Sequence, residues 1–202
     1  MSTVLQAHWT PAEKLPWDRS RGRQAMLLFI ATEAMLFAAL FFSYFYLARQ
    51  SPQWPPDEPP KLMLALIMLA ILLASSGVLY GAEHLVKQGR HTGARLLVLL
   101  TAGMGAVFLY LQTLEYAEHF KHLRPGEDAY ASAFYTLTSV HGAHVTLGVL
   151  ILLYAARLPL GPEPKPPHKP LRTAALYWHF VDLVWVLIVA LLYLLPRLRG
   201  LA

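Results

Sequence analysis

The sequence has no cysteine and little charge. None of its 202 residues is Cys, which excludes a disulfide scaffold, a thiolate metal site and a cysteine nucleophile. Only 14% of the residues are charged, against about 25% in an average soluble chain, and 56% are hydrophobic. Disordered chains combine low hydrophobicity with high charge, so disorder is excluded as well.

Proline is missing from five long stretches that are also almost free of charge. Each holds about 20 residues, which at 1.5 Å per residue cross the ~30 Å hydrocarbon core of a bilayer as an α-helix. A membrane strand needs only ~10 alternating residues, so strands are excluded. The stretches cover residues 26–47, 62–82, 96–116, 133–156 and 174–195. The sequence therefore predicts an all-α, polytopic membrane helix bundle with five transmembrane helices.

The prolines and the polar segments divide the chain into regions. Prolines gather in the segments between the first and second stretches and between the fourth and fifth, and Pro196 is expected to close the last helix. We predict a cytoplasmic N-terminal arm at residues 1–25, a five-helix membrane domain at residues 26–196 and a short tail at residues 197–202.

The positive charges predict the orientation. Eleven Lys or Arg residues fall on the side of the N-terminal arm and six on the other side. The positive-inside rule then places the N-terminus in the cytoplasm and the C-terminus outside. The formal net charge of +5 is thus a topology signal, with possible contacts to anionic headgroups. It does not indicate nucleic acid, because the cations do not form one face of a folded domain.

Glu33 is an ionisable residue near the middle of the first stretch, with apolar neighbours on both sides. Such a residue is costly in a membrane and needs a partner or a purpose. Three interpretations stay open: a proton-relay group, a carboxyl that binds a lipid or a helix partner, and a neutral acid hydrogen-bonded inside the bundle.

The fourth and fifth stretches carry two further pairs of polar residues. His141 and His144 are three apart and share a face, which favours hydrogen bonding between helices, although two such histidines can also bind metal. His179 and Asp182 have the same spacing and predict a local ion pair. At the outer end of the third stretch, Glu115, Glu118 and His119 are expected to be solvated.

No constellation of residues predicts chemistry within the chain. By rise per residue, His141 and His179 differ in depth by roughly 10 Å, so a bis-His haem is disfavoured. Di-iron spacing and nucleotide-binding motifs are missing too. We expect no catalytic residue, no metal and no cofactor site. One hypothesis is that four cytoplasmic histidines buffer protons near the site of proton uptake. The favoured interpretation is that they are ordinary solvated loop residues. The four are His8, His84, His91 and His168.

Three segments resemble subunit III of the haem–copper oxidases, most closely cytochrome c oxidase subunit III. They are MLLFIATEAMLFAALFFSYFY at residues 26–46, FYTLTSVHGAHVTLG at residues 134–148 and YWHFVDLVW at residues 177–185. Their order and spacing agree with the family, and the third string is very specific. The similarity extends over residues 23–195.

The resemblance implies a subunit of a proton-pumping terminal oxidase that passes electrons from cytochrome c to oxygen in aerobic respiration. Haem and copper belong to partner subunits, and this chain would pack on subunit I, near subunit II, in a prokaryotic plasma membrane. The family implies support of stability, of lipid binding and of proton uptake by subunit I. Glu33 matches the acid beside the family's lipid cleft and Arg157 a phosphate-binding Arg. His141, His144, His179 and Asp182 match signature polar positions.

The chain departs from the family's long form, which has seven helices. The two missing helices form one wall of the lipid cleft, so a bound phospholipid here depends on another subunit. Five-helix relatives include subunit III of quinol oxidases and accessory proteins of nitric oxide reductase, which stay as alternatives. Two alternatives belong to another class: a transporter and a haem-binding electron carrier. The lack of internal repeats counts against the transporter.

Overall fold

The computed structural model describes residues 21–51, 54, 62–119, 126, 129–158 and 169–199. Five helices in this part are long and apolar enough to cross a membrane, and no strand occurs in it. The predicted all-α fold with five transmembrane helices is confirmed. The helices are α1 (Arg21–Gln50), α2 (Leu62–Lys87), α3 (His91–His119), α4 (Ala129–Arg157), α5 (Lys169–Ile188), the π-helix η2 (Val189–Leu194) and α6 (Leu195–Arg199).

The helices extend beyond most ends of the apolar stretches. α3 begins at His91 rather than at residue 96, and α2 continues to Lys87 rather than ending at residue 82. An apolar run marks only the segment that lies in hydrocarbon. The helix itself continues into the interface, because its hydrogen bonds form there as well and its charged side chains reach water.

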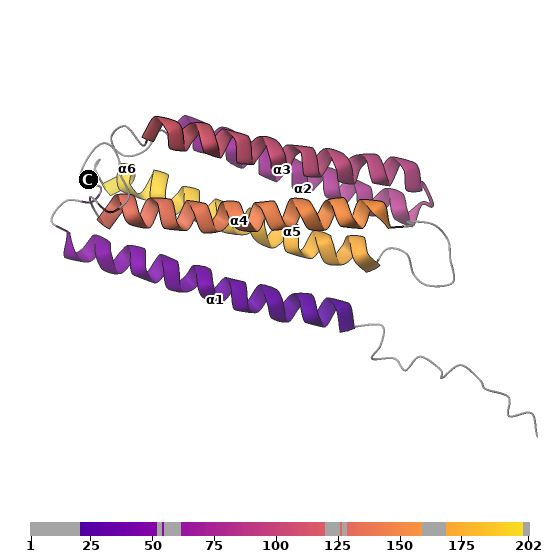
Figure 1. The fold of residues 1–202 in the computed structure, drawn as a ribbon, viewed down its shortest axis with the longest axis horizontal. Helices are drawn as coiled ribbons and strands as arrows, with labels where there is room; N and C mark the ends of the chain where they lie inside the picture. The colour runs from indigo at the N-terminus through magenta and orange to yellow at the C-terminus, as the bar shows by residue number, and fades with distance from the viewer. Residues whose placement is uncertain are drawn as a thin grey trace, which may run out of the picture.

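The bundle is built around α2, α3, α4 and α5, with α1 along one side (Figure 1). α2 packs on α3, α3 on α4 and α4 on α5, while α1 contacts α4 and α5. A tight turn joins α2 to α3: Gly89 has φ 76°, and the Arg90 N–H donates to the Leu85 carbonyl at 2.9 Å. This is a glycine C-cap, in which the positive φ lets the chain reverse and satisfies the last carbonyls of α2.

The interior contains large aromatic side chains that fit against glycines. Trp178 and Trp185 of α5 are fully buried. A Cβ built on Gly105 would lie 2.6 Å from Cη2 of Trp178, and one on Gly148 would lie 2.8 Å from Cε3 of the same ring. Close helix approach through small residues is how membrane helices pack without a hydrophobic driving force between them.

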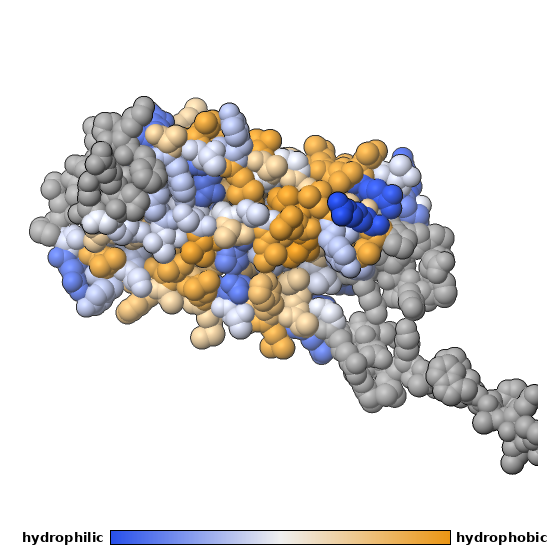
Figure 2. All heavy atoms as spheres, viewed as in Figure 1, coloured by the Kyte–Doolittle hydropathy of each residue, from blue (hydrophilic) through white to orange (hydrophobic). Residues whose placement is uncertain are grey.

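The outer face of the bundle is apolar, as a lipid environment requires. Met35 of α1, Phe42 of α1 and Met63 of α2 expose 74%, 72% and 72% of their surface. Figure 2 shows apolar side chains over much of the face that it presents. In water this arrangement would be unfavourable, whereas in a bilayer these side chains contact acyl chains.

α1 is attached to the bundle by one narrow stripe. Of the 18 residues that form the most apolar part of α1, only 6% are buried, which is the lowest share among the five spanning helices. Phe37 and Tyr44 are its buried residues, and Glu33 and Leu40 are partly buried. These four positions are spaced at i, i+4, i+7 and i+11, which places them on one helical face. Most of the α1 surface is therefore left to lipid or to another protein.

Pro196 does not close the last helix, so that prediction was wrong. α5 passes without a break into η2, and α6 continues to Arg199. Proline has no N–H and its ring crowds the carbonyl four residues earlier, here that of Leu192. A π-helical turn widens the helix just before the proline, which is a common response to a disrupted ladder.

Two tyrosines donate to the two carbonyls that could have accepted the N–H that Pro196 lacks. In an α or a π ladder, that N–H would bond the carbonyl of Leu192 or Leu191. The Tyr44 hydroxyl donates to the Leu191 carbonyl at 3.2 Å, and the Tyr130 hydroxyl donates to the Leu192 carbonyl at 3.4 Å. Side chains of α1 and α4 thus replace the backbone donor, as a low-dielectric interior demands.

Candidate functional site

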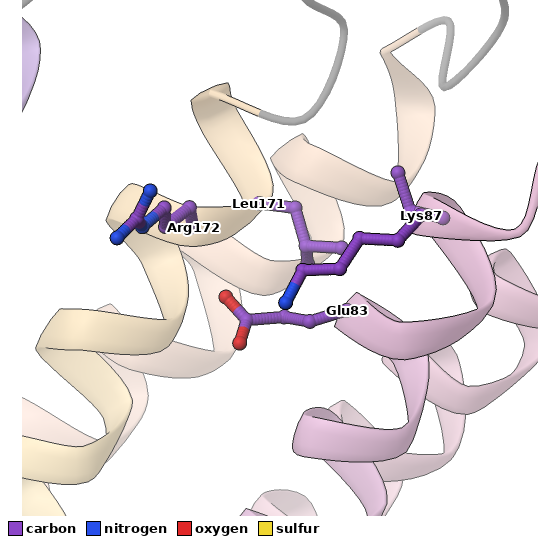
Figure 3. A pocket seen from close by; sticks show the side chains of 5 residues that line it. Glu83, Lys87, Leu171 and Arg172 are labelled. Atoms are coloured by element: carbon purple, nitrogen blue, oxygen red, sulfur yellow. The ribbon is translucent and has the colours of Figure 1, made fainter.

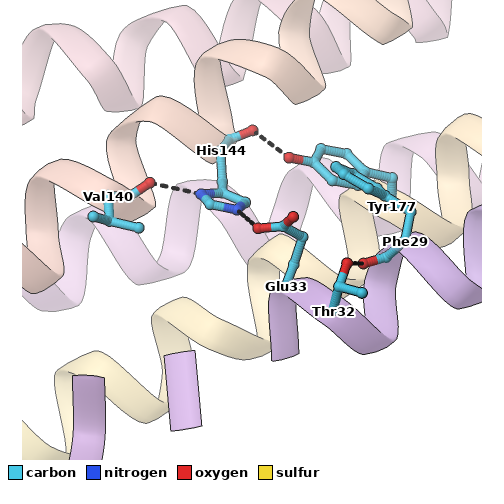
Figure 4. A network of polar contacts seen from close by, with 6 residues as sticks. All are labelled: Phe29, Thr32, Glu33, Val140, His144 and Tyr177. Atoms are coloured by element: carbon cyan, nitrogen blue, oxygen red, sulfur yellow. Dashed lines mark hydrogen bonds and ion pairs between the residues drawn. The ribbon is translucent and has the colours of Figure 1, made fainter. Parts of the chain in front are cut away.

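Glu33 of α1 and His144 of α4 contact each other between the two helices (Figure 4). Oε2 of Glu33 lies 2.8 Å from Nε2 of His144, and their side chains are only 20% and 12% exposed. Nδ1 of His144 lies 2.7 Å from the carbonyl oxygen of Val140. Since a carbonyl only accepts, Nδ1 carries a proton. Nε2 and the carboxyl then share one further proton, as an imidazolium–carboxylate pair or as a neutral acid donating to a neutral ring.

Aromatic side chains surround this pair. The Tyr177 hydroxyl of α5 donates to the backbone carbonyl of His144 at 3.2 Å, and Phe29 of α1 stacks on the Tyr177 ring at 5.9 Å. Phe37 presents an edge contact to the His144 ring, with centroids 4.9 Å apart. The polar contact therefore lies among apolar rings at a junction of α1, α4 and α5, where water competes little with it.

His141 has quite different surroundings from His144. It is fully buried, its ring stacks on Trp185 at 5.0 Å, and Phe108 contacts it edge-on at 5.6 Å. Neither of its ring nitrogens has a hydrogen-bond partner among the described residues. Hydrogen bonding between helices is thus found for His144 and not for His141. Nowhere in the described ranges do three His, Cys, Asp or Glu side chains come together as a metal site would require.

His179 and Asp182 meet through a third residue rather than as a direct ion pair. Nδ1 of His179 lies 2.7 Å from the Ser76 hydroxyl of α2, and that hydroxyl donates to Oδ2 of Asp182. A hydroxyl has one proton, so His179 donates to Ser76 and Ser76 donates to Asp182. The neighbouring Ser75 accepts from Nε1 of Trp178 at 2.8 Å. Consecutive serines on α2 thus bind α5 at two places, which sequence reasoning missed.

Glu115 is not solvated, so that expectation was wrong. It is 1% exposed, and Oε1 accepts a hydrogen bond from the Tyr193 hydroxyl at 2.8 Å. Tyr193 belongs to η2, so the π-helical turn of the last helix contacts α3 near its C-terminal end. Glu118 is exposed as expected, and His119 is half-buried with Nδ1 donating to the Glu115 carbonyl at 2.9 Å.

A further polar contact between α3 and α4 was not anticipated from the sequence. Nε2 of Gln112 donates to the Thr138 carbonyl at 2.6 Å, and the Tyr116 hydroxyl lies 2.6 Å from Oγ1 of Thr138. Gly142 makes room for the amide, because a Cβ there would lie 2.7 Å from Oε1 of Gln112. The available signal was a glutamine in an apolar stretch, which has the same need for a partner as an acid.

The structure separates Arg157 from the Glu33–His144 pair. Arg157 is the last residue of α4 and is exposed. It follows His144 by thirteen positions, which is about 20 Å along the helix axis. Of the loop histidines, His84 lies in the last turn of α2 and His91 at the start of α3, while His8 and His168 lie outside the described residues.

The helices and their internal polar contacts define a class: a multi-pass helical membrane protein. Residues 19–196 match the family described as cytochrome c oxidase subunit III. A protein of Synechocystis sp. (strain ATCC 27184 / PCC 6803 / Kazusa) named cytochrome c oxidase subunit 3 is 37% identical to this chain, over 96% of this chain and 85% of the relative. The protein of the same name from Thermostichus vulcanus is 36% identical, over 85% of this chain and 86% of the relative. The relative of that name from Gallus gallus is 31% identical over 95% of this chain and 74% of its own length.

The chain belongs to the cytochrome c oxidase subunit III family. The resemblance drawn from the three sequence segments is confirmed. Subunit III is not the subunit of the oxidase that binds its cofactors, and membership implies a complex with other oxidase subunits.

Proposed function

We propose that this chain packs on subunit I of a proton-pumping cytochrome c oxidase, near subunit II, in a prokaryotic plasma membrane. The complex passes electrons from cytochrome c to oxygen, using haem and copper held by the partner subunits. This chain has no catalytic residue and contributes stability, lipid contacts and support of proton uptake by subunit I. Its family and its five apolar helices support this assignment.

The contact between Glu33 and His144 is the observation that carries the proposal for the site. α1 packs on the bundle through one narrow stripe of side chains. Within this stripe, Glu33 of α1 makes a polar contact with His144 of α4. A hydrogen bond in surroundings of low dielectric is stronger than one in water. We assign to this pair the role of fixing α1 against α4, with one shared proton retained inside the membrane.

The remaining signature residues have supporting roles in this proposal. Asp182 and His179 hold α5 to α2 through Ser76, and His141 fills the centre of the bundle against Trp185. Arg157 lies at the end of α4, where an Arg presents its planar fork to the phosphate of a lipid headgroup.

Purification of the tagged chain in mild detergent tests the assignment to an oxidase. We expect haem-bearing and copper-bearing chains to co-purify, and we expect the chain isolated from them to have no visible absorption. Glu33→Leu should lower the yield of assembled complex or shorten its active lifetime during turnover, whereas Thr32→Val, on the exposed side of α1, should change neither. A coloured isolated chain, or an absence of oxidase partners, would contradict the proposal.

The proposed orientation places the N-terminus in the cytoplasm and the C-terminus outside. The chain has no native cysteine, so a single cysteine reports one position. Gln88→Cys lies in the turn after α2 and Ser51→Cys follows α1. In intact cells a membrane-impermeant maleimide should label Ser51→Cys and leave Gln88→Cys unlabelled until the membrane is opened. The reverse pattern would overturn the orientation.

A further inference from the structure

His179 of α5 has a ring nitrogen without a partner in the described part of the chain. Its Nδ1 bonds the Ser76 hydroxyl, which donates to Asp182, whereas Nε2 has no hydrogen bond or ion pair there. The side chain is exposed. It lies five positions inside the apolar stretch that begins at residue 174, which is about 8 Å of helix. A polar nitrogen therefore meets the surroundings of the bundle at the depth of the hydrocarbon.

Three exposed threonines show how a polar side chain can face lipid in this bundle. The hydroxyls of Thr32, Thr113 and Thr146 each donate to a carbonyl of their own helix, three or four positions earlier. A hydroxyl bonded in this way leaves no unpaired donor among acyl chains. Nε2 of His179 has no such bond, so it needs a partner from outside the bundle.

The hydrogen bonds within the bundle decide what chemistry Nε2 offers. The Ser76 proton is used on Asp182, so Nδ1 of His179 carries a proton and donates to Ser76. Hydrocarbon favours the neutral ring. In a neutral ring with its proton on Nδ1, Nε2 has a lone pair and accepts. The outside partner must therefore supply a donor, such as a hydroxyl, an indole N–H or an amide, which acyl chains do not have.

His179 lies where α2 and α5 run antiparallel and in register. Ser76 and Glu83 are seven positions apart on α2, and Arg172 and His179 are seven apart on α5, so each pair shares a helical face. Ser76 contacts His179, and Glu83 and Arg172 line one cavity at the end of the bundle (Figure 3). We call this surface the α2–α5 seam, which consists of Leu73, Ser76, Tyr80, Glu83 and Lys87 of α2 with Arg172, His179 and Leu183 of α5.

Apolar side chains flank the polar contact along the seam. Leu73 and Tyr80 lie three positions before and four after Ser76, and Leu183 lies four after His179. They expose 50%, 68% and 58% of their surface. Rows with a seven-residue spacing fit a third helix at the small left-handed crossing angle that most membrane bundles use. The seam therefore suits a spanning helix.

The seam ends in a charged cavity. Its volume is about 280 Å³, and Glu83, Lys87 and Arg172 form its charged lining over the buried Val86 and Leu171. No ion pair joins these charged groups to one another in the part of the chain that the structure describes. Two cations and one carboxylate leave an excess of positive charge, which attracts an acidic side chain from outside.

A second copy of the chain does not fit the seam. In a two-fold dimer the same surface meets itself. The acceptor nitrogen of one His179 would then face that of the other, and the cations of one cavity would face the cations of its mate. A different protein is needed, with a donor at the depth of His179 and an acidic side chain near the cavity.

We propose that a spanning helix of the haem-bearing subunit packs in the α2–α5 seam and donates a hydrogen bond to Nε2 of His179. An acidic side chain near the end of that helix meets Lys87 and Arg172. The inference rests on the proposed function, in which that subunit is the partner. It adds the face of this chain that is used and the chemistry of the contact.

Photo-cross-linking in the purified oxidase complex tests which face is used. p-Benzoylphenylalanine replaces Leu183 in the seam and, as matched controls, Leu100 of α3 and Leu150 of α4, which are exposed by 58%, 52% and 57%. We expect a cross-link to the haem-bearing chain from Leu183 and lipid adducts from the controls. Lipid adducts alone from Leu183, or a cross-link from Leu183 to a chain without haem, would overturn the proposal.

Two substitutions of His179 separate the outward contact from the bond within the bundle. His179→Asn places an amide donor where Nδ1 lies and keeps the bond to Ser76, whereas His179→Gln places an acceptor where Nε2 lies. His179→Asn should speed loss of the chain from the immobilised complex in detergent by about three- to fifteen-fold, the effect of one polar contact between membrane helices. His179→Gln should speed it less, and Thr113→Val, which removes an exposed hydroxyl of α3, should not change it.

Unfolding of the full chain in detergent should rank the two variants in the opposite order. His179→Asn should be the more stable there, because it retains the donor to Ser76. If both measurements gave the same order, His179 would act only within the bundle and the proposal would be wrong.

Failure of the seam is distinguishable from failure of the proposed function. If no haem-bearing chain co-purifies, both are overturned. If that chain co-purifies and cross-links from Leu100 or Leu150 but not from Leu183, the partner stands and the seam alone is overturned.

Discussion

Tyr44 of α1 donates a hydrogen bond to the carbonyl oxygen of Leu191, five residues before Pro196 in the last helix. The contact ties the most exposed spanning helix to the one place where the backbone ladder of the last helix is disturbed. Tyr44 lies three turns beyond Glu33 on the same face of α1. Together they hold α1 at two points, one through His144 and one through a backbone carbonyl.

Removing the tyrosine hydroxyls at the π-helical turn tests this account. Tyr44→Phe/Tyr130→Phe leaves the carbonyls of Leu191 and Leu192 without these donors, at a cost of about 1–3 kcal/mol in the free energy of unfolding. Denaturant titration of the chain in detergent measures it. Tyr154→Phe, whose side chain is exposed on α4, should be neutral. Equal stability of the double variant and wild type would show that the π-helical turn needs no outside donor.

The Glu33–His144 pair should show coupling in a double-mutant cycle. We expect Glu33→Leu and His144→Leu to interact by about 0.5–1.7 kcal/mol, the range found for polar contacts between membrane helices. Unfolding of the chain in detergent gives the four free energies. A parallel cycle of Thr32→Val with His144→Leu should give no coupling, because Thr32 bonds its own helix at the Phe29 carbonyl. Additive effects in the first cycle would remove the pair's proposed role.

Two glycines of α3 should respond in opposite ways to the same change. Gly105→Ala places a Cβ 2.6 Å from the Trp178 ring and 2.7 Å from Cγ2 of Val149, which should destabilise the chain by about 1–3 kcal/mol through overpacking. Gly103→Ala meets nothing within 4 Å and should be neutral or slightly stabilising, since Ala favours helix. Thermal unfolding in detergent compares the two. Tolerance of Gly105→Ala would mean that Trp178 repacks freely.

The buried acid at the end of α3 depends on one phenol. Tyr193→Phe removes the donor to Glu115 and should cost about 1–3 kcal/mol, because a buried carboxyl loses its partner. Glu115→Gln keeps an acceptor oxygen and should cost less. Glu118→Gln, at an exposed position, is the matched control for loss of an acid. If both acid variants behaved alike, burial of Glu115 would have no energetic consequence.

The proposal for subunit assembly adds a prediction about α1. Its outer face exposes Met35, Leu36 and Phe42, so a polar change there tests whether a protein or lipid covers it. Met35→Gln should lower recovery of assembled oxidase if a subunit covers this face, since an unpaired amide in an interface costs about 1–3 kcal/mol. Blue-native electrophoresis measures assembly. Tyr110→Gln, on the exposed face of α3, serves as the control.

The sequence by itself determined that the chain crosses a membrane five times. The length of each apolar run against the bilayer thickness decides this, and neither quantity depends on how the helices pack. Glu33 was also identifiable, because an acid among apolar residues needs a partner wherever that partner lies. What the sequence did not give was the partner itself, His144, 111 positions away.

The tertiary structure decided which face of each helix meets which neighbour. Residues three apart on a helix differ by about 60° around its axis, and in this core that angle separates His141, stacked on Trp185, from His144, paired with Glu33. Burial of Glu115 and the passage of the last helix through Pro196 likewise depend on tyrosines from other helices. These outcomes follow from contacts between distant segments, which local periodicity and composition do not contain.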